Sequence, residues 1–450
     1  MSTQSGTADP MQKHAHRRRE AGEEGRKAPS VLHLSESDTP GGAPRAGYRV
    51  HRAFVEEGMD SRMLVGEKHS GDPTVEEHRP GSAPARLADR LRGKANRWTA
   101  RLSDPERWNV HYTGWLGRLD PGQVNRREVD MVHLQWFHGS FASVRALGAL
   151  RKPVVWTLHD MWAFCGTEHY APDGPGARWR VGYTPESRDD SEKGWDVKRW
   201  TWKRKQRHWR RPMHIVTPSR WLGACVRESA LMGDWPVRVI PYALDLQTYR
   251  PHDQTEARRA LGLPPDVPLV LFGAVGGGRN PRKGWDLLEP ALAPLAASVP
   301  GVEGIVFGQE APDERPDYGM PVHYMGYLDD HHTLARLYSA ADLMAVPSRQ
   351  DNLPQTGLEA QACGCPVVAF DTAGMPDVLE DGETGKLAEP FSSEDLARAM
   401  TWVLEDPQRL GRLREASRRR AEERWSPETV ARQYRELYEE ILQRQGKAGL

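Results

Sequence analysis

Residues 343–370, LMAVPSRQDNLPQTGLEAQACGCPVVAF, contain a short apolar run, a polar loop, a helical stretch and a second apolar run. The two runs, 343–346 and 366–370, have the length and the apolar content of buried strands. Pro354 suits the start of a helix, because proline is tolerated in the first helical turn. A strand, a helix and a strand in this order predict parallel strands covered by helices.

The same alternation continues on both sides of this unit, and it predicts an α/β fold. The other candidate strands are 31–34, 62–65, 129–134, 153–158, 214–218, 237–240, 269–273, 302–307 and 322–325. The rhythm breaks at 241–253 and then restarts with a strand that ends in a glycine-rich loop. We therefore expect two doubly wound, Rossmann-like domains that face a cleft, where ligands sit beyond the carboxyl ends of the strands.

The predicted organisation has four parts. They are a disordered tail at 1–29, a first domain at 30–243, a second domain at 244–426 and a final helix at 427–450. The tail is charged and has no apolar stretch, which argues against a secretory signal. The final helix has one apolar face, so it must pack against another element. The residues of this face are Val430, Tyr434, Leu437, Tyr438 and Ile441.

Composition excludes several classes of protein. The chain has 450 residues, and its 62 Lys and Arg balance its 62 Asp and Glu, which argues against a dedicated nucleic-acid-binding protein. No apolar run approaches the roughly 18 residues that cross a bilayer, so we expect no membrane-spanning helix and a cytoplasmic location. The four cysteines have no C-x-x-C spacing, which predicts buried, reduced thiols and no zinc site.

Two carboxylates lie within residues 343–370. Asp351 precedes the predicted helix and Glu359 lies near its start, so both can face the crevice at the strand ends. Carboxylates there accept hydrogen bonds from vicinal hydroxyl pairs, as on a ribose or a sugar ring. The alternative is that both acids only favour the helix dipole, which is worth about 0.3 to 1 kcal/mol.

Residues 351–370 resemble the nucleotide-sugar site of the family 4 retaining glycosyltransferases, and within that family the exopolysaccharide and colanic-acid subgroup. The family has the two-domain GT-B fold. Its usual motif is Glu, seven residues and Glu, and here Asp351 takes the first position and Glu359 the second. The resemblance implies sugar contacts for Asp351 and ribose contacts for Glu359. Asn352 and Leu353 replace glycines often found between the acids, and they belong to the same predicted donor site.

Residues 272–285, FGAVGGGRNPRKGW, join a strand to a helix and predict an anion site. Backbone N–H groups, the helix dipole and cations meet in such a loop. A dinucleotide fingerprint would need glycine where Pro281 stands, which excludes a dehydrogenase. In the resembled family a Lys and an Arg of this loop hold the donor diphosphate; Lys283 matches the Lys, and Arg279 or Arg282 the Arg. The alternative is a solvated basic turn.

The first domain contributes two further predictions. Gly41 and Gly42 follow the first strand, and they resemble the family loop that approaches the donor diphosphate across the cleft. His159 lies in 155–162, VWTLHDMW, which resembles the exopolysaccharide subgroup, where the matching His contacts the transferred sugar. The alternatives are a simple turn and a satisfied polar side chain. The resemblance also implies that the final helix crosses back to the first domain.

Trp195, Trp202 and Trp209 recur every seven residues, and the stretch from Lys198 to Arg211 holds eight bases and no acid. This pattern predicts an amphipathic helix that docks on an anionic inner leaflet beside a lipid-linked acceptor. The alternative is that the tryptophans pack into the first domain and the bases face solvent.

These features predict a glycosyltransferase that moves a sugar from a UDP-sugar or a GDP-sugar to a hydroxyl of a glycan, with a lipid-linked acceptor and a role in bacterial-type polysaccharide synthesis. The resemblance further implies retention of configuration, no cofactor and no essential metal ion. His159 and Asp351 would orient the sugar, and Lys283 with its arginine would stabilise the departing diphosphate. Alternatives are a non-catalytic glycan-binding scaffold, and an epimerase or a phosphorylase of the same fold.

Overall fold

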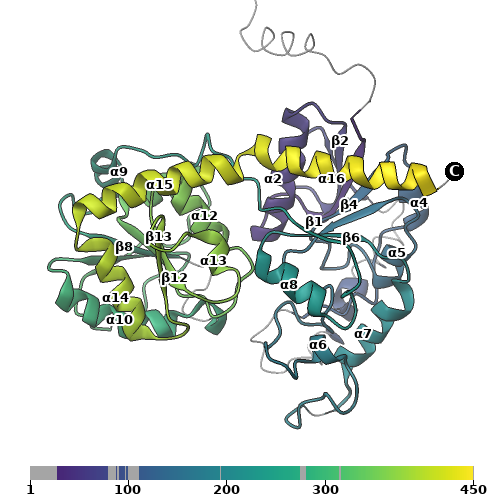
Figure 1. The fold of residues 1–450 in the computed structure, drawn as a ribbon, viewed down its shortest axis with the longest axis horizontal. Coiled ribbons are helices and arrows are strands. Elements are labelled where there is room, and N and C mark those ends of the chain that lie inside the picture. Colours follow the sequence, from purple (N-terminus) through teal and green to yellow (C-terminus); the bar gives the residue numbers. More distant parts are fainter. Residues whose placement is uncertain are drawn as a thin grey trace, which may run out of the picture.

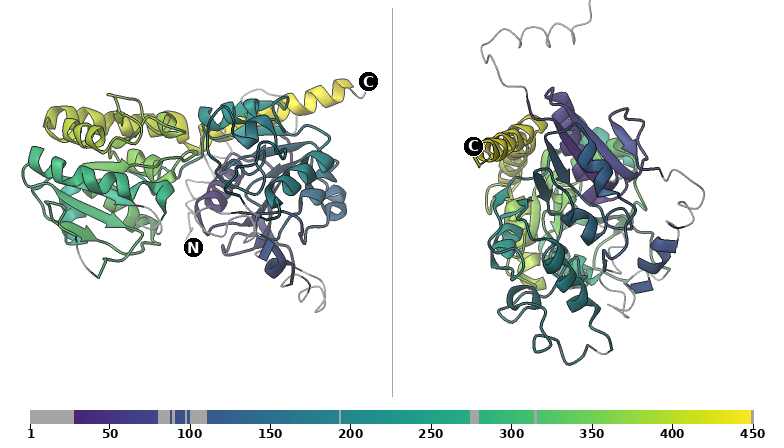
Figure 2. Two further views of the ribbon diagram at one scale, coloured as in Figure 1. Left: turned by 90° about the horizontal axis from the view of Figure 1, so that it is seen from below. Right: turned by 90° about the vertical axis from the view of Figure 1, so that its right-hand side faces the viewer.

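The structure is a computed structural model, and it describes residues 28–79, 88, 91–96, 98–99, 111–192, 194–273, 280–313 and 316–448. Two units stand side by side, each a sheet with helices on both faces (Figures 1 and 2). Every pairing between the named strands is parallel. The predicted α/β class, with two doubly wound Rossmann-like sheets, is therefore confirmed.

The first sheet has the strand order β3-β2-β1-β4-β5-β6-β7. Its strands are β1 (Val31–Ser37), β2 (Ser61–Glu67), β3 (Val75–Glu77), β4 (Met131–Leu134), β5 (Val154–Thr157), β6 (His214–Thr217) and β7 (Val237–Val239). Leu34 of β1 lies opposite Leu64 on one side and Leu134 on the other. The strand order reverses between β1 and β4, which opens a crevice at their carboxyl ends.

The second sheet has the order β10-β9-β8-β11-β12-β13. Its strands are β8 (Leu269–Gly273), β9 (Glu303–Phe307), β10 (Val322–Tyr324), β11 (Leu343–Val346), β12 (Val367–Phe370) and β13 (Gly385–Ala388). Residues 343–370 form β11, the helix α12 (Gln355–Ala362) and β12, and the order reverses between β8 and β11. The short edge strands β3 and β13 were not among the predicted ones, because VEE and GKLA are too short and too polar to signal a strand.

The helices and one 3-10 turn fill the connections. In the first unit they are α2 (Gly42–Glu56), α4 (Pro121–Arg126), α5 (Val144–Gly148), α6 (Arg178–Val181), α7 (Val197–His208) and α8 (Arg220–Glu228). In the second they are α9 (Gln254–Leu261), η2 (Pro281–Lys283), α10 (Trp285–Ser298), α11 (His331–Ala340), α13 (Met375–Val378), α14 (Ser393–Leu404) and α15 (Pro407–Trp425). Side chains cap several of them; Ser219, for example, accepts from the backbone N–H of Leu222.

The last helix, α16 (Pro427–Ala448), leaves the second unit and lies across the first (Figure 1). Its apolar face is buried, and the rings of Tyr434 and Tyr438 each lie 5.7 Å from that of Phe54. Tyr434 Oη lies 2.8 Å from Thr157 Oγ1, and Tyr438 Oη lies 2.7 Å from His133 Nδ1. The helix thus ties the end of the chain to β4 and β5. The bounds predicted for the four parts of the chain stay a prediction.

The helix α7 corrects the prediction of a membrane-facing tryptophan stripe. Trp202 and Trp209 are buried in the apolar core of the first unit, while Trp195 is 55% exposed. Lys205, one of the predicted bases, is also buried and donates to the carbonyl oxygens of Cys165 and Gly166. Two of the three tryptophans face inward because burying an apolar helix face in the core removes it from water.

Two expectations from composition can be compared with the structure. Among the described residues, no helix is long and apolar enough to cross a bilayer. All four cysteines are buried and free.

Candidate active site

The loops after β8 and β11 meet at the reversal of the second sheet. Lys283 and Arg282 lie on η2, which follows β8 after the undescribed residues 274–279, and Asp351 lies on the loop after β11. Lys283 Nζ donates to Asp351 Oδ2 at 2.6 Å, and Arg282 Nη1 is 3.0 Å from the same oxygen. Burial alone would raise the pKa of Asp351, but the two cations outweigh it and hold the pKa below its usual value.

A glycine permits this close approach. Gly284 has φ 71°, and a Cβ there would lie 1.9 Å from the carbonyl oxygen of Pro347. Only a residue without a side chain lets the end of η2 rest against the loop after β11. That packing places Lys283 and Asp351 within hydrogen-bonding distance.

The first unit reaches the same carboxylate. Tyr170 Oη donates to Asp351 Oδ1 at 3.3 Å, and the Arg282 guanidinium stands 4.2 Å from the centre of the Tyr170 ring. Asn352 bridges the units as well, because its Nδ2 donates to the carbonyl oxygen of His159 at 3.1 Å. Ser219 Oγ donates to Asn352 Oδ1 at 2.6 Å. The site around Asp351 is therefore built from both sheets.

Glu359 lies on α12 and is 3% exposed. Its Oε1 lies 2.9 Å from Nη2 of Arg49, which stands on α2 of the first unit, and Tyr338 donates to its Oε2 at 3.2 Å. Arg49 also donates to Oε1 of Gln355 at 2.8 Å. Both predicted carboxylates thus hold a charge-assisted contact, one to cations of its own unit and one to a cation of the other.

His159 lies just past β5 and is 8% exposed. Its Nδ1 is 3.0 Å from Tyr242 Oη and its Nε2 is 3.2 Å from Gln135 Oε1. Burial lowers the pKa of His159 to about 4, so the imidazole is neutral near pH 7. A neutral ring held at both nitrogens can orient a hydroxyl group but carries no charge of its own.

Gly41 and Gly42 lie where the first unit meets α12. Gly41 has φ 85°, and a Cβ at Gly42 would stand 3.3 Å from Nε2 of Gln355, which donates to the Gly42 carbonyl oxygen. Leu353 is buried in the apolar core of the second unit, so its side chain faces away from polar ligands. Arg279 lies outside the described residues, and its role stays a prediction, as do the binding and catalytic roles of the other site residues.

Sequence reasoning missed several residues of this site. Arg49, Tyr170, Tyr242 and Gln135 contact predicted site residues, yet they stand alone in α2 and in irregular segments. No local spacing marks them, because their contact with the site depends on the sheet order. Another group, His138, Asp160 and His169, was also missed, since its members share no metal-ligand spacing.

A cavity of about 1220 Å³ opens beside this site. Residues that line it include Thr39, Arg45, Arg49, Arg52 and His331. The cavity is not lined by Lys283, Asp351 or Glu359. It adjoins the site through Arg49, which lines the cavity and pairs with Glu359.

Comparisons with known proteins identify the class of this protein. Residues 40–248 match the family model described as Glycosyltransferase Family 4, and residues 270–406 match the model described as Glycosyl transferases group 1. The first unit thus matches one glycosyltransferase model and the second unit matches the other. The exopolysaccharide subgroup was not confirmed.

Curated relatives include proteins named D-inositol 3-phosphate glycosyltransferase. The one from Segniliparus rotundus is 34% identical over 184 residues, which are 39% of this chain and 40% of the relative. The one from Mycobacterium bovis is 37% identical over 188 residues, 39% of this chain and 38% of the relative. The match spans about two fifths of the length of these relatives.

Solved structures show the same fold. HepE of Anabaena, solved with UDP and glucose, has a TM-score of 0.59 and 20% identity, over 92% of this chain and 100% of that one. Sucrose-phosphate synthase of Thermosynechococcus elongatus has a TM-score of 0.61 and 18% identity, over 92% and 99%. These similarities confirm the predicted GT-B fold.

Proposed function

We propose that this protein is a retaining glycosyltransferase that moves a sugar from a UDP-sugar or a GDP-sugar to a hydroxyl of a glycan. The observation that carries the proposal is Asp351, held between Lys283 and Arg282 and contacted by Tyr170 of the other unit. A bound diphosphate draws the two cations to its own oxygens. Asp351 is then free to accept hydrogen bonds from sugar hydroxyls.

The chemistry follows from the charges. Breaking the bond between sugar and phosphate leaves negative charge on the diphosphate, which Lys283 and Arg282, with Arg279 as a further candidate, stabilise. His159 orients the sugar, since Tyr242 and Gln135 hold its neutral ring. Glu359 accepts from the ribose hydroxyls. In this proposal the departing phosphate takes the proton of the acceptor hydroxyl, and the anomeric configuration of the sugar is retained. Transfer from the donor needs neither a cofactor nor a metal ion.

The acceptor proposed first is a lipid-linked glycan of polysaccharide synthesis, used at the cytoplasmic face of a membrane. Support comes from α7 and the residues beside it, where the exposed Trp195 and Trp200 accompany the exposed Lys203, Arg207 and Arg210. Flotation with phosphatidylglycerol vesicles tests this surface. We expect the wild type to float with the vesicles and the variant with glutamate at these three positions to remain unbound. Flotation of the variant like that of the wild type would contradict the membrane proposal, and so would a wild type that does not float.

A small phosphorylated polyol is a second candidate acceptor. The names of the curated relatives favour it, and so does the cavity beside Arg49, which Arg45 and Arg52 line. Arginine suits phosphate because its guanidinium donates two parallel hydrogen bonds. Transfer assays with D-inositol 3-phosphate and with inositol separate the candidates, because only a phosphate-reading site prefers the first. An Arg45→Gln variant should lose that preference.

The first test of the donor site is thermal unfolding with UDP, GDP or ADP, on the wild type and on Glu359→Gln. Ligand at a hundred times its Kd adds about 2.7 kcal/mol of stability. Glu440→Gln is the control, because Glu440 is 2.9 Å from Arg238, the same distance as in the Arg49 pair. We expect one nucleotide to stabilise the wild type and the control but not Glu359→Gln. If no nucleotide stabilises the wild type, the proposal of a non-catalytic glycan-binding scaffold replaces this one. If the protein epimerises the donor sugar without transferring it, the epimerase alternative is favoured.

A further inference from the structure

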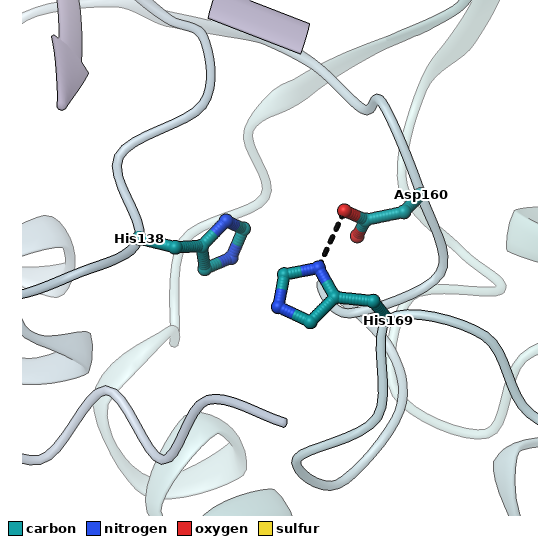
Figure 3. A group of neighbouring side chains, drawn as sticks. All are labelled: His138, Asp160 and His169. Carbon is teal, nitrogen blue, oxygen red and sulfur yellow. Dashed lines mark hydrogen bonds and ion pairs between the residues drawn. The ribbon is translucent and has the colours of Figure 1, made fainter. Parts of the chain in front are cut away.

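Three polar side chains converge in the first unit, next to His159 (Figure 3). His138 follows β4, Asp160 follows β5, and His169 lies nine residues farther along the chain. One nitrogen of each imidazole and one carboxylate oxygen all lie within 4.8 Å of one another. His169 Nδ1 is 2.6 Å from Asp160 Oδ2, and the two imidazole rings stand 4.5 Å apart. The group thus combines two imidazoles and one carboxylate in one small volume.

Hydrogen bonds within the described residues leave part of this group unsatisfied. Neither ring nitrogen of His138 has a partner there, and Nε2 of His169 has none either. The side chains are deeply buried, with exposed fractions of 6% for His138 and 5% for His169. A buried polar group without a partner costs about 1–3 kcal/mol. A cation bound through one nitrogen of His138 would give that buried atom the partner it lacks.

The surroundings of His138 are aromatic. The rings of Tyr112, Trp136, Phe137 and Trp162 have their centres between 4.6 and 5.1 Å from that of His138. An apolar shell disfavours a protonated imidazolium and keeps the ring in the neutral form that binds metal ions. Lys205, the nearby cation on α7, donates to the carbonyl oxygens of Trp162, Cys165 and Gly166 rather than to Asp160. Asp160 Oδ1 accepts from the backbone N–H of Trp162 at 2.9 Å and Oδ2 lies 2.6 Å from His169 Nδ1, and each oxygen keeps a further lone pair that a cation can take.

We propose that His138, Asp160 and His169 bind one Zn²⁺ ion. Two histidines and one carboxylate form a known zinc ligand set, with water in the fourth position. Ligand bonds of about 2.0–2.2 Å in a tetrahedron place the ligand atoms about 3.3–3.5 Å apart. The ligand atoms lie up to 4.8 Å apart, so the longest separation must shorten by up to about 1.5 Å, while the contact between His169 and Asp160 lengthens. As the ion takes the place of the proton on His169 Nδ1, that proton moves to Nε2 of the same ring, so the imidazole binds in its neutral form.

The ion would be structural, and its place explains why it matters. Asp160 directly follows His159, and His169 directly precedes Tyr170. These two neighbours are among the first-unit residues that meet Asn352 and Asp351. A backbone hydrogen bond of 2.9 Å from Met161 to the His169 carbonyl already joins the two segments. Zinc would also fix both segments to the loop after β4. Residues that do not themselves react hold the reacting groups in position in the same way. The assignment does not depend on the proposed transferase activity.

Metal content tests the proposal on the full chain. The protein is loaded with Zn²⁺, dialysed against metal-free buffer and measured by mass spectrometry of the metal. His138→Gln removes one ligand without breaking a hydrogen bond that the structure shows. His323→Gln is the control, because His323 Nε2 lies 2.6 Å from the Glu303 carboxylate in the second unit, the distance at which His169 lies from Asp160. We expect about one ion per chain in the wild type and the control, and near none in His138→Gln.

A second readout keeps the test decisive if His138→Gln fails to fold. Wild-type protein loaded with Co²⁺ should show the intense visible absorption of a four-coordinate ion, and Zn²⁺ should displace it. Wild-type protein that retains no metal after dialysis overturns the proposal. Zinc retained equally by a folded His138→Gln, or cobalt with the weak spectrum of an octahedral ion, overturns it too.

Discussion

Arg49 and Glu359 join the two sheets through an ion pair of 2.9 Å between residues that lie 310 positions apart. The side chains are 12% and 5% exposed, so the pair is shielded from solvent. Glu359 also accepts from Tyr338, and Arg49 also donates to Gln355. The carboxylate expected to hold the ribose is therefore engaged by the opposite unit.

Replacing Arg49 by Met should destabilise the protein by about 3 kcal/mol, because it leaves a buried carboxylate without its cation. Arg49→Met combined with Glu359→Gln should cost much less than the sum of the single changes. Urea unfolding of the four proteins measures this coupling. Strict additivity would show that the pair contributes nothing to the contact between the sheets.

Lys283→Ala should lower the rate of sugar transfer about 10²- to 10³-fold, because it removes one cation from the developing charge of the diphosphate. Lys386→Ala is the matched control, since Lys386 also pairs with an aspartate, Asp381, at 2.9 Å in the same unit. Transfer rates at saturating donor compare the two variants. Equal rates in both would contradict the role proposed for Lys283.

Gly284→Ala should disturb the contact between Lys283 and Asp351 through the backbone. The added Cβ would meet the Pro347 carbonyl at 1.9 Å, in addition to the cost of about 1–2 kcal/mol for a left-handed residue. Gly382→Ala, with φ 77° and no atom within 4 Å of its Cβ, carries only the second cost. Chemical unfolding and nucleotide affinity of the two variants should therefore differ. A similar loss of stability in both would mean that the loop after β11 moves aside freely.

Trp202→Ala should cost about 3–5 kcal/mol, as for other large core side chains, while Trp200→Ala should change stability little. The two residues are neighbours on α7, but Trp202 is 7% exposed and Trp200 is 54% exposed. Thermal or urea unfolding distinguishes them. A loss of stability for Trp202→Ala as small as that for Trp200→Ala would restore an outward position for Trp202.

His51 should make the protein less stable in acid. Burial lowers its pKa to about 4 in the folded state, whereas an unfolded histidine titrates near its usual value of about 6.5, although Asp72 opposes the shift. Between these values the unfolded chain binds the extra proton, so stability rises with pH across the window and falls as pH drops. Unfolding of His51→Gln at pH 4.5 and 7 should show a smaller pH dependence, by up to about 1.4 kcal/mol per pH unit. An unchanged slope would assign the effect to other histidines.

The chain itself determined the alternation of strands and helices, the apolar face of α16 and the loop that holds Asp351 ahead of Glu359. These features depend on residues within a few turns of one another, where periodicity and turn preferences act. Only the tertiary structure decided which distant groups meet. The reversal of strand order between β8 and β11 places Lys283 beside Asp351, and the approach of α2 to α12 pairs Arg49 with Glu359. Periodicity showed that α7 has a tryptophan face but not where this face points. The elements that pack against the helix decide which of its faces is buried.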